Sequence, residues 1–243
     1  MNIAVTGGDG VLARALRAFL PDATYLSREV CDVRDYWSVA HALKYADVVI
    51  HAAALTDHQH PNAAEVIETN VFGTENVARA CVAFDRRLVY LSTHYVYPGV
   101  RGNYDEYDTV RPIGAYAWSK LAGEHWVEQL HPNALVVRGS WYTYRMRVAH
   151  WRRNGALTDA FCSREPVEDA ARKIAALART DAQGVVNIGG PRRSFHEIAR
   201  EVCGDDVREI TRAELERALA LPYAFPRDIS VSTEKFDAMG LVT

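Results

Sequence analysis

Tyr116 and Lys120 are the first residues whose types and spacing could do chemistry. They stand four positions apart in Tyr116-Ala117-Trp118-Ser119-Lys120, whose pattern favours a helix, so both side chains would lie on one helix face. A free tyrosine has a pKa near ~10, and a nearby ammonium lowers that pKa by favouring the phenolate. The pair could therefore be a proton donor with its activator. A plain surface pair on a helix is the alternative.

Ser92 and Thr93 are a second candidate, because they follow the apolar run 88–91 directly. If that run is a strand of a parallel sheet, its carboxyl end lies where ligands bind in open α/β sheets. A hydroxyl at that place could hydrogen-bond a substrate carbonyl and the oxyanion formed from it. A turn that merely ends the strand could contain the same residues.

A glycine-rich segment suggests a nucleotide ligand. Thr6-Gly7-Gly8-Asp9-Gly10-Val11-Leu12-Ala13 follows the apolar run Ile3-Ala4-Val5 and precedes a helical pattern. Such a strand-to-helix turn lets the backbone approach a pyrophosphate, and the helix N-terminus offers free N–H groups to it. The segment predicts a dinucleotide site, with a tight turn that binds nothing as the alternative.

The end of the second expected strand, Leu26-Ser27-Arg28, bears on the choice of coenzyme. An acid at this place takes the ribose hydroxyls of NAD, whereas a basic residue accommodates the extra phosphate of NADP. A serine hydroxyl and a guanidinium suit a phosphate, so NADP(H) is favoured over NAD(H). Glu29 is the reservation, since a shift of one residue in the turn would present an acid instead.

The elements that must position these residues alternate regularly. Short β-branched apolar runs alternate with longer segments of helical period, which indicates βαβ units and a parallel sheet. The expected fold class is α/β, a Rossmann-type doubly wound parallel sheet with a small C-terminal substrate-binding lobe. Strands are expected at 3–5, 23–26, 48–50, 88–91, 135–137 and 185–188, and helices at 12–20, 63–84, 116–130, 167–178 and 195–202.

Composition narrows the function classes. The 243 residues carry a net charge of -3 and are 49% hydrophobic, as in ordinary soluble globular proteins. The four cysteines lie far apart, which disfavours a disulfide framework, and Asp57-His58-Gln59-His60 lacks a third metal ligand, so we expect no metal site. We expect a cytoplasmic protein, without a membrane span or secretion signal, that does not bind nucleic acid.

Six motifs taken together resemble a known superfamily. In order and spacing they are similar to the extended short-chain dehydrogenase/reductases: Thr6-Gly7-x-x-Gly10-x-x-Ala13, Asp32-Val33, His51-Ala52-Ala53-Ala54, Asn70-Val71-Phe72-Gly73-Thr74, Ser92-Thr93 and Tyr116-x-x-x-Lys120. Within it the chain most resembles the sugar-nucleotide reductases of the dTDP-4-dehydrorhamnose reductase family. That closer likeness lies in 91–99, 104–106, 111–112, 116–124, 137–142 and 225–228.

The resemblance implies an NADPH-dependent reduction of a keto group on a nucleotide-linked deoxysugar, as in deoxysugar biosynthesis. Thr93 would orient the carbonyl, Tyr116 would be the acid/base and Lys120 its activator. The coenzyme-binding residues would be Gly7, Gly10, Val11, Leu12, Ser27, Arg28, Asp32, Val33, Ala52, Ala53, Ala54, Tyr116 and Lys120. The substrate contacts would be His94, Tyr95, Arg138, Ser140 and Trp141.

Three other functions remain open at this point. They are an NAD(P)-dependent sugar-nucleotide epimerase, a reductase of a non-sugar ketone, and a non-catalytic NADP-binding regulatory subunit. Family likeness also allows a homodimer through the helices that contain Tyr116 and Ala63. Asn70 could act structurally from its helix.

The chain departs from the family in two places. His94 stands where these reductases usually have Asp, so the sugar could differ, and His94-Tyr95 in place of an Asp-Glu pair argues against a dehydratase. The stretch between Arg138 and Val167 is shorter and rich in Arg, Trp and Tyr. It could bind a nucleoside diphosphate, bind single-stranded nucleic acid, or form a mobile loop. We expect residues 1–140 to form the NAD(P)-binding core and residues 141–243 a reduced substrate lobe interleaved with the core's last strand and helices.

Overall fold

A six-stranded parallel sheet forms the centre of the molecule. The computed structural model describes residues 1–57, 62–221 and 223–241, with the backbone alone at 144–147 and 149. The sheet order is β2-β1-β3-β4-β5-β10, and every neighbouring pair is parallel. The six predicted strands are confirmed within two residues of their expected bounds: β1 (Ile3–Thr6), β2 (Thr24–Leu26), β3 (Val48–His51), β4 (Arg87–Thr93), β5 (Leu135–Gly139) and β10 (Gly184–Asn187).

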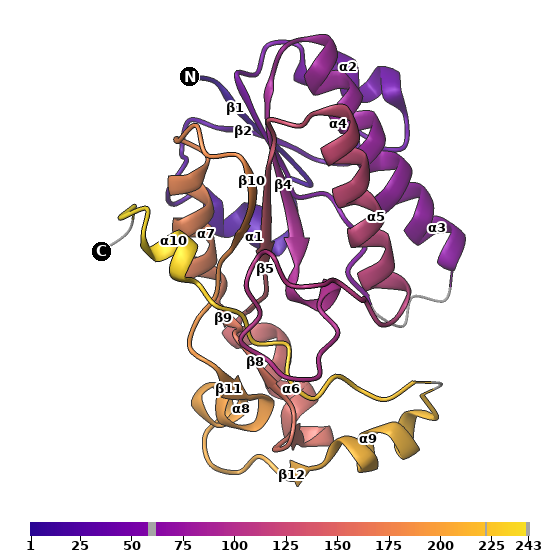
Figure 1. Ribbon diagram of the computed structural model, residues 1–243, viewed down its shortest axis with the longest axis vertical. Helices are drawn as coiled ribbons and strands as arrows, with labels where there is room; N and C mark the ends of the chain where they lie inside the picture. Colours follow the sequence, from indigo (N-terminus) through magenta and orange to yellow (C-terminus); the bar gives the residue numbers. More distant parts are fainter. Residues whose placement is uncertain (58–61, 222, 242–243) are drawn as a thin grey trace.

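Helices cover both faces of this sheet, as Figure 1 shows. Because successive strand residues point to opposite faces, Ile3 and Val5 pack on one helix layer and Ala4 on the other. The first layer contains α1 (Val11–Leu16), α7 (Val167–Leu177) and α10 (Glu234–Asp237). The second contains α2 (Tyr36–Leu43), α4 (Gly73–Ala83) and α5 (Ala115–Leu130). The doubly wound α/β fold is therefore confirmed.

The strand order reverses beside β1. From β1 the chain runs to β2 on one side and then to β3 on the other side. In open α/β sheets, ligands bind outside the carboxyl ends of the strands at such a reversal. The turn after β1 and the loop after β3 therefore flank the expected ligand crevice.

The segment predicted as one helix over 63–84 is interrupted. It consists of α3 (Ala63–Ile67), a π-helical turn η1 (Glu68–Phe72) and α4. The wide turn contains the fully buried Asn70, whose carbonyl accepts a hydrogen bond from the Thr74 hydroxyl at 2.7 Å. Extra residues of this kind inside helices are frequent at functional sites. The helix α2, which the sequence analysis did not expect, begins where the Asp35 side chain accepts a hydrogen bond from the Trp37 N–H.

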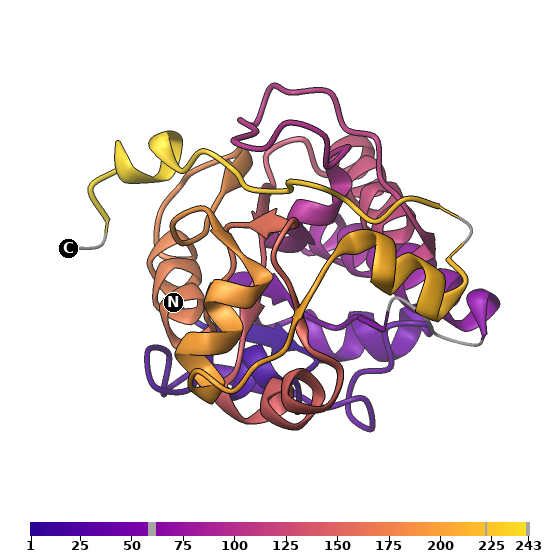
Figure 2. The same ribbon diagram turned by 90° about the horizontal axis from the view of Figure 1, so that it is seen from below.

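The C-terminal part adds a second body below the sheet (Figures 1 and 2). Seen from that end in Figure 2, the orange helix α8 lies in front of the sheet. Its core contains Trp151, Ile198 and Ile210. Its elements are α6 (Tyr144–Asn154), α8 (Phe195–Cys203), α9 (Arg212–Leu219) and the strand pairs β6 (Trp141–Tyr142) with β9 (Glu165–Pro166), β7 (Ala156–Leu157) with β12 (Glu209–Ile210), and β8 (Phe161–Cys162) with β11 (Arg193–Ser194). The Arg-rich segment thus folds as helix α6 rather than as a loop, because Trp151 is buried in this core.

A late segment ties the two bodies together. The amides of Arg227 and Asp228 donate to the Gly99 carbonyl at 2.7 and 3.0 Å, and the Ile229 amide donates to the Phe161 carbonyl at 2.9 Å.

Ser194 caps α8 in a reciprocal capping box with Glu197, so Phe195-His196-Glu197 is a helix start.

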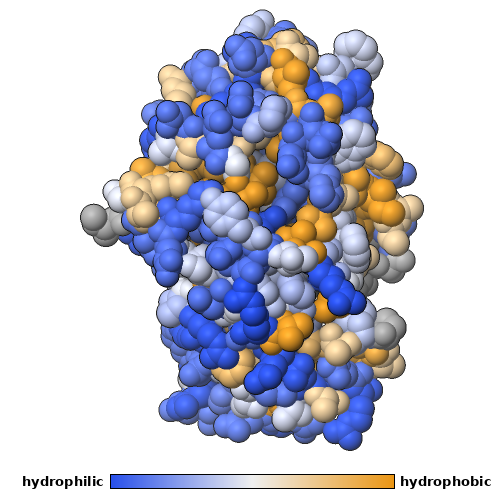
Figure 3. Space-filling view, in the orientation of Figure 1, coloured by the Kyte–Doolittle hydropathy of each residue, from blue (hydrophilic) through white to orange (hydrophobic). Residues whose placement is uncertain are grey.

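The face in Figure 3 is mostly hydrophilic, with hydrophobic residues in small separate groups. Such scattered groups are normal on a protein surface. Among the described helices, none combines the length and the apolar character that a bilayer crossing needs.

Candidate active site

A cavity of about 230 Å³ lies at the strand-order reversal. Gly7 has a φ of 68°, and a Cβ there would stand 2.8 Å from the Ala53 Cα, so only glycine lets the β1 turn approach the loop after β3 this closely. Gly10 precedes α1 with extended backbone. Eight of the predicted coenzyme residues line the cavity: Gly7, Gly10, Arg28, Asp32, Val33, Ala52, Ala53 and Ala54.

Other predicted coenzyme residues lie outside this lining. Leu12 is buried in the core and Val11 packs against it. The Ser27 carbonyl accepts the Cys31 amide at 2.9 Å. The sequence analysis missed Asp9, Cys31, Leu55 and Thr69, which also line the cavity. Asp9, Cys31 and Leu55 follow predicted strands, and that position was the available signal, whereas Thr69 lies in the turn η1.

Arg28 lines the cavity and Glu29 does not. The Arg28 side chain is 60% exposed, and its Nε lies 3.8 Å from an Asp32 carboxylate oxygen. Asp32 is held more tightly by Arg34, whose Nη2 donates at 2.5 Å. This hydrogen bond lowers the pKa of Asp32. The Arg28 guanidinium, at the exposed edge of the cavity, is therefore only weakly paired with the Asp32 carboxylate.

A buried polar chain fixes the floor of this cavity. The Thr6 Oγ1 accepts hydrogen bonds from the Ala52 and Ala53 amides, both at 3.2 Å, so its hydroxyl donates to His51 Nδ1 at 2.8 Å. His51 Nε2 in turn donates to the Thr74 Oγ1 at 3.1 Å. Burial, with a smaller contribution from the Lys120 charge, lowers the pKa of His51 to about 3, so the imidazole is neutral.

Asn70 connects this floor to the helix that contains the catalytic candidates. Its amide group exchanges two hydrogen bonds with the backbone of Leu55, at 2.8 and 2.9 Å, and donates a third to the Ser119 Oγ at 2.9 Å. Ser119 then donates to the Tyr116 carbonyl at 2.7 Å. Asn70 thus holds the loop after β3 against the first turn of α5.

Thr93 and Tyr116 are brought together by the fold. Thr93 ends β4 and Tyr116 lies in the first turn of α5, where the Thr93 side chain is close enough to act on the pKa of the Tyr116 phenol. Burial raises the pKa of Tyr116 to about 12, while the Thr93 side chain and the charge of Arg164 act in the lowering direction. The expected lowering by Lys120 is not found, because burial of the phenol outweighs every nearby charge. Tyr116 is therefore a neutral phenol at physiological pH.

Lys120 lies one turn further along α5 and is only 2% exposed. Its Nζ is 4.2 Å from the centre of the Tyr90 ring and has no hydrogen-bond acceptor in the described part of the chain. Burial lowers the pKa of Lys120 to about 7, and the charge of Glu124 opposes that shift. Lys120 lines neither of the two cavities.

Arg138 does not reach either cavity lining. From β5 it donates to Glu124 through Nε at 3.0 Å and Nη2 at 2.7 Å, and to the Tyr97 hydroxyl through Nη1 at 3.0 Å. The Ser92 hydroxyl donates to the same Glu124 carboxylate. These buried hydrogen bonds hold the part of α5 that contains Lys120 and Glu124 against β4 and β5.

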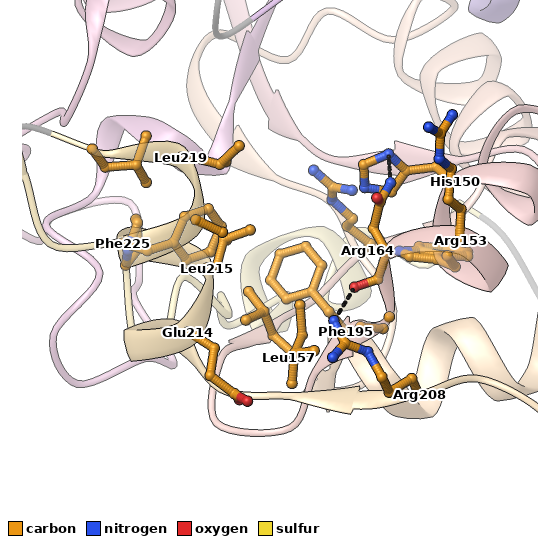
Figure 4. Close-up of a pocket in the computed structure, with 18 of the residues that line it drawn as sticks. His150, Arg153, Leu157, Arg164, Phe195, Arg208, Glu214, Leu215, Leu219 and Phe225 are labelled. Carbon is orange, nitrogen blue, oxygen red and sulfur yellow. Dashed lines mark hydrogen bonds between the residues drawn. The ribbon is translucent and has the colours of Figure 1, made fainter.

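A second cavity, of about 720 Å³, lies between the two bodies. The loop after β3 borders both cavities, with Leu55 in the first and Thr56 in the second. In Figure 4 the labelled basic side chains His150, Arg153 and Arg164 lie toward one side and Leu215 and Leu219 toward the other. Further lining residues include Tyr95, Trp151, Arg208, Glu214, Tyr223 and Phe225.

The predicted substrate residues have different positions. Tyr95 lines the second cavity. Ser140 accepts a hydrogen bond from Arg164 Nε at 3.2 Å, and Trp141, in β6, packs against the core of the sheet body. His94 is fully buried, and its Nε2 donates to the Ile188 carbonyl at 2.9 Å. Burial lowers the pKa of His94 to about 4, so its imidazole is neutral. The hydrogen bond of His94 joins the residues that follow β4 to the end of β10.

Two remaining expectations concern metals and missed residues. Within the ranges that the structure describes, no three His, Cys, Asp or Glu side chains group as metal ligands do, and His58 and His60 lie outside these ranges. Arg164, which lines the second cavity, was missed. In the sequence Arg164 is followed by Glu165. Neighbouring opposite charges of this kind look like an ordinary surface pair, so the pattern did not single out Arg164.

Comparison with known proteins gives concordant results. The family model of the RmlD substrate binding domain matches residues 1–150. A dTDP-4-dehydrorhamnose reductase of Mycobacterium tuberculosis (strain CDC 1551 / Oshkosh) is 32% identical over 251 aligned positions, which cover 89% of this chain and 81% of the relative. A dTDP-4-keto-6-deoxy-D-glucose reductase of Streptomyces niveus is 30% identical over 220 positions, covering 81% of this chain and 75% of the relative.

A solved structure has the same fold. The crystal structure of dTDP-4-dehydrorhamnose reductase from Bacillus anthracis in complex with NADP is similar with a TM-score of 0.88 and 24% identity. The match covers 100% of this chain and 94% of that chain.

Proposed function

The chain belongs to the RmlD substrate binding domain family, and on that premise we propose that it reduces a keto group on a nucleotide-linked deoxysugar with NADPH. The resemblance to the extended short-chain dehydrogenase/reductases, drawn from motifs, is confirmed by the same findings. The observation that carries the proposal is the placement of Tyr116, in the first turn of α5, close to Thr93 at the end of β4, which sets a proton donor beside a carbonyl-orienting hydroxyl.

The residues at the first cavity fit a nicotinamide dinucleotide. Gly7 and Gly10, which have no side chains, would hold the pyrophosphate, and Asp32 and Val33 would contact the adenine. The loosely paired Arg28 suits the additional phosphate of NADPH. The buried ammonium of Lys120, which lacks an acceptor, suits a ribose hydroxyl.

The chain's own chemistry is proton supply and orientation. The bound coenzyme supplies the hydride that reduces the carbonyl carbon. The Thr93 hydroxyl orients the carbonyl oxygen, and the Tyr116 hydroxyl donates its proton to that oxygen as negative charge develops. A reductase needs this phenol protonated at the start of the reaction, and the raised pKa of Tyr116 ensures that it is. Asn70 and the Glu124–Arg138 pair keep α5 in register with the floor of the cavity.

The second cavity would take the nucleotide-linked sugar. Its volume of about 720 Å³ lies within the usual range for small-molecule sites, roughly 300–1,000 Å³. Trp151 and Phe225 offer apolar surface, while Arg153 and Arg208 offer charge to a diphosphate. We assign the coenzyme and the catalytic residues to positions 1–140, and to 141–243 a substrate lobe interleaved with β10, α7 and α10 of the sheet body. A homodimer through the helices that contain Ala63 and Tyr116 is consistent with the exposed Phe72 and Trp118.

Oxidation of NADPH by the purified protein, with dTDP-linked 4-keto-6-deoxysugars as substrates, tests this function. We expect sugar-dependent net oxidation, and Tyr116→Phe should lower kcat by about 10³-fold because the proton donor is lost. Affinity for NADPH, measured by fluorescence titration, should change less than about twofold. Tyr107→Phe, at an exposed tyrosine, is the matched control and should keep the wild-type rate.

Net NADPH oxidation separates a reductase from an epimerase, which returns its hydride to the sugar. NADPH binding without oxidation of any keto sugar would reject the proposal. A Tyr116→Phe variant with most of the wild-type rate would reject the role of Tyr116 while leaving the reductase function standing.

A further inference from the structure

Two arginines are buried near the catalytic residues, and they differ in how their charge is compensated. Arg138 is 5% exposed and forms an ion pair with Glu124, whose carboxylate oxygen lies 2.7 Å from its Nη2. Arg164 is 8% exposed, and no carboxylate of the described residues pairs with it. Its neighbour Glu165 instead pairs with Lys173 at 2.6 Å. Arg164 is thus a buried cation without a counter-ion among the residues that the structure describes.

The contacts of Arg164 fix its plane but leave donors unused. Its Nε donates to the Ser140 Oγ at 3.2 Å, and its Nη2 donates to the Tyr95 hydroxyl at 3.0 Å. Both partners are neutral hydroxyls. Nη1 has no hydrogen-bond acceptor among the residues that the structure describes. Nη1 and the second N–H of Nη2 therefore form a free edge of the fork that suits two anionic oxygens.

Arg164, which has that free edge, lines the second cavity. Arg164 and Tyr95 both line this cavity, and both act electrostatically on the Tyr116 phenol. In Figure 4 Arg164 lies on the same side as His150 and Arg153, opposite Leu215 and Leu219. An anion at Arg164 would therefore lie in the same cavity as Tyr95, whose hydroxyl accepts from Arg164 and which stands two positions after Thr93.

A buried, unpaired charge destabilises a fold, and removing one is often neutral or stabilising. A cation in this state is explained if a ligand supplies its counter-ion. Resting on the proposed reductase function, we propose that Arg164 binds an oxyanion of the substrate, either a carboxylate on the sugar or the phosphate ester that joins the sugar to the nucleotide. Arg164 is then a specificity-determining residue as well as a substrate contact.

Binding of three ligands to the NADP⁺-loaded protein tests this site by calorimetry. The ligands are dTDP-glucuronate, dTDP-glucose and dTDP. The variants are Arg164→Gln, Arg164→Lys, and the control Arg200→Gln, whose exposed side chain pairs with Asp205 outside the cavity. Charge-assisted hydrogen bonds to an oxyanion predict a loss of roughly 10- to 100-fold in affinity for Arg164→Gln.

The pattern across ligands identifies the source of the anion. A loss confined to dTDP-glucuronate supports the site and assigns it to a sugar carboxylate. An equal loss for all three ligands supports the site and assigns it to a phosphate. Affinities within twofold of the wild type for all three in Arg164→Gln would overturn the proposal.

Two controls keep these outcomes separate. Arg164→Gln should unfold at the wild-type temperature or above, since an unpaired buried cation is removed. If it fails to fold, Arg164→Lys, which keeps the charge without the fork, should show an intermediate loss, and wild-type affinity in it would overturn the proposal. Because binding is read without turnover, absence of NADPH oxidation would reject the reductase function and leave the anion site to be judged separately.

Discussion

The two cavities of this molecule are built in different ways. The coenzyme cavity is lined by residues between positions 7 and 69, most of them at the ends of β1, β2 and β3, and its shape depends on backbone at Gly7, Gly10 and Ala52 to Ala54. The substrate cavity is lined by side chains from 56 to 226, which come from loops of the sheet body and from α6, β7, α9 and the last segment.

This difference follows from what each cavity must do. Any dinucleotide presents the same pyrophosphate, and a turn of fixed conformation between a strand and a helix can bind it with N–H groups. A particular sugar nucleotide must be recognised by side chains, and these come from segments that are distant in the chain. Four predictions test how far the coenzyme half depends on its fixed framework.

The largest effect is expected at Arg138. It decides whether Arg138 supports the fold or contacts the substrate. Arg138→Met leaves the buried Glu124 without its partner, so the free energy of unfolding should fall by about 3–5 kcal/mol. The matched Arg34→Met, at an exposed pair with Asp32, should lose about 1 kcal/mol or less. Urea unfolding measures both. A stable Arg138→Met with weakened sugar-nucleotide binding would place Arg138 in the substrate half instead.

Gly7→Ala tests whether backbone shape makes the coenzyme cavity. A Cβ at Gly7 meets Ala53 at 2.8 Å in a backbone conformation with φ of 68°, so we expect a loss of about 3 kcal/mol in stability and weaker NADPH binding. Gly184 has a φ of 73° with open space around it, so Gly184→Ala should lose about 1 kcal/mol and keep its NADPH affinity. Equal NADPH affinity in both variants would contradict a backbone-built site.

The pH dependence of stability tests the burial of Lys120. The lysine keeps its proton up to pH 10.5 when unfolded but only to about pH 7 when folded. Unfolding therefore takes up a proton between these values, and stability should rise by about 2 kcal/mol from pH 7 to pH 9 in the coenzyme-free protein. Lys120→Met should lack this rise and be more stable than the wild type at pH 7. Parallel urea curves for both proteins across this range would show that Lys120 is not a buried ammonium.

The smallest effect is expected at the exposed mouth of the coenzyme cavity. Arg28→Ala removes a loosely held cation, so the preference for NADPH over NADH should fall about tenfold, measured as the ratio of kcat/KM values. Glu29→Ala should leave the preference unchanged, because Glu29 does not line the cavity. The opposite result would assign coenzyme choice to the acid.

Local patterns predicted the parts of the fold that depend on local physics. The strands were found because β-branched runs suit a sheet buried on both faces, and α5, α7 and α8 because their apolar residues follow the helical period. The π-helical turn around Asn70 was not predicted, since its extra residue is fixed by hydrogen bonds to Leu55 and Ser119, which lie far away in sequence. Helix α6 was not predicted either, because its Arg-rich sequence is helical only once Trp151 is buried against α8.

The sequence by itself determined the fold class, the glycine turn after β1 and the Tyr116–Lys120 pair, because each is written in a local pattern or a short helical spacing, whereas the fold brings Thr93 to Tyr116. Only the tertiary structure decided the states of these groups. It raised the pKa of Tyr116 by burial, paired Arg138 with Glu124, and left Arg164, in the lining of the substrate cavity, without a carboxylate partner among the described residues. Burial and pairing depend on which distant segments meet, and no spacing along the chain encodes that meeting.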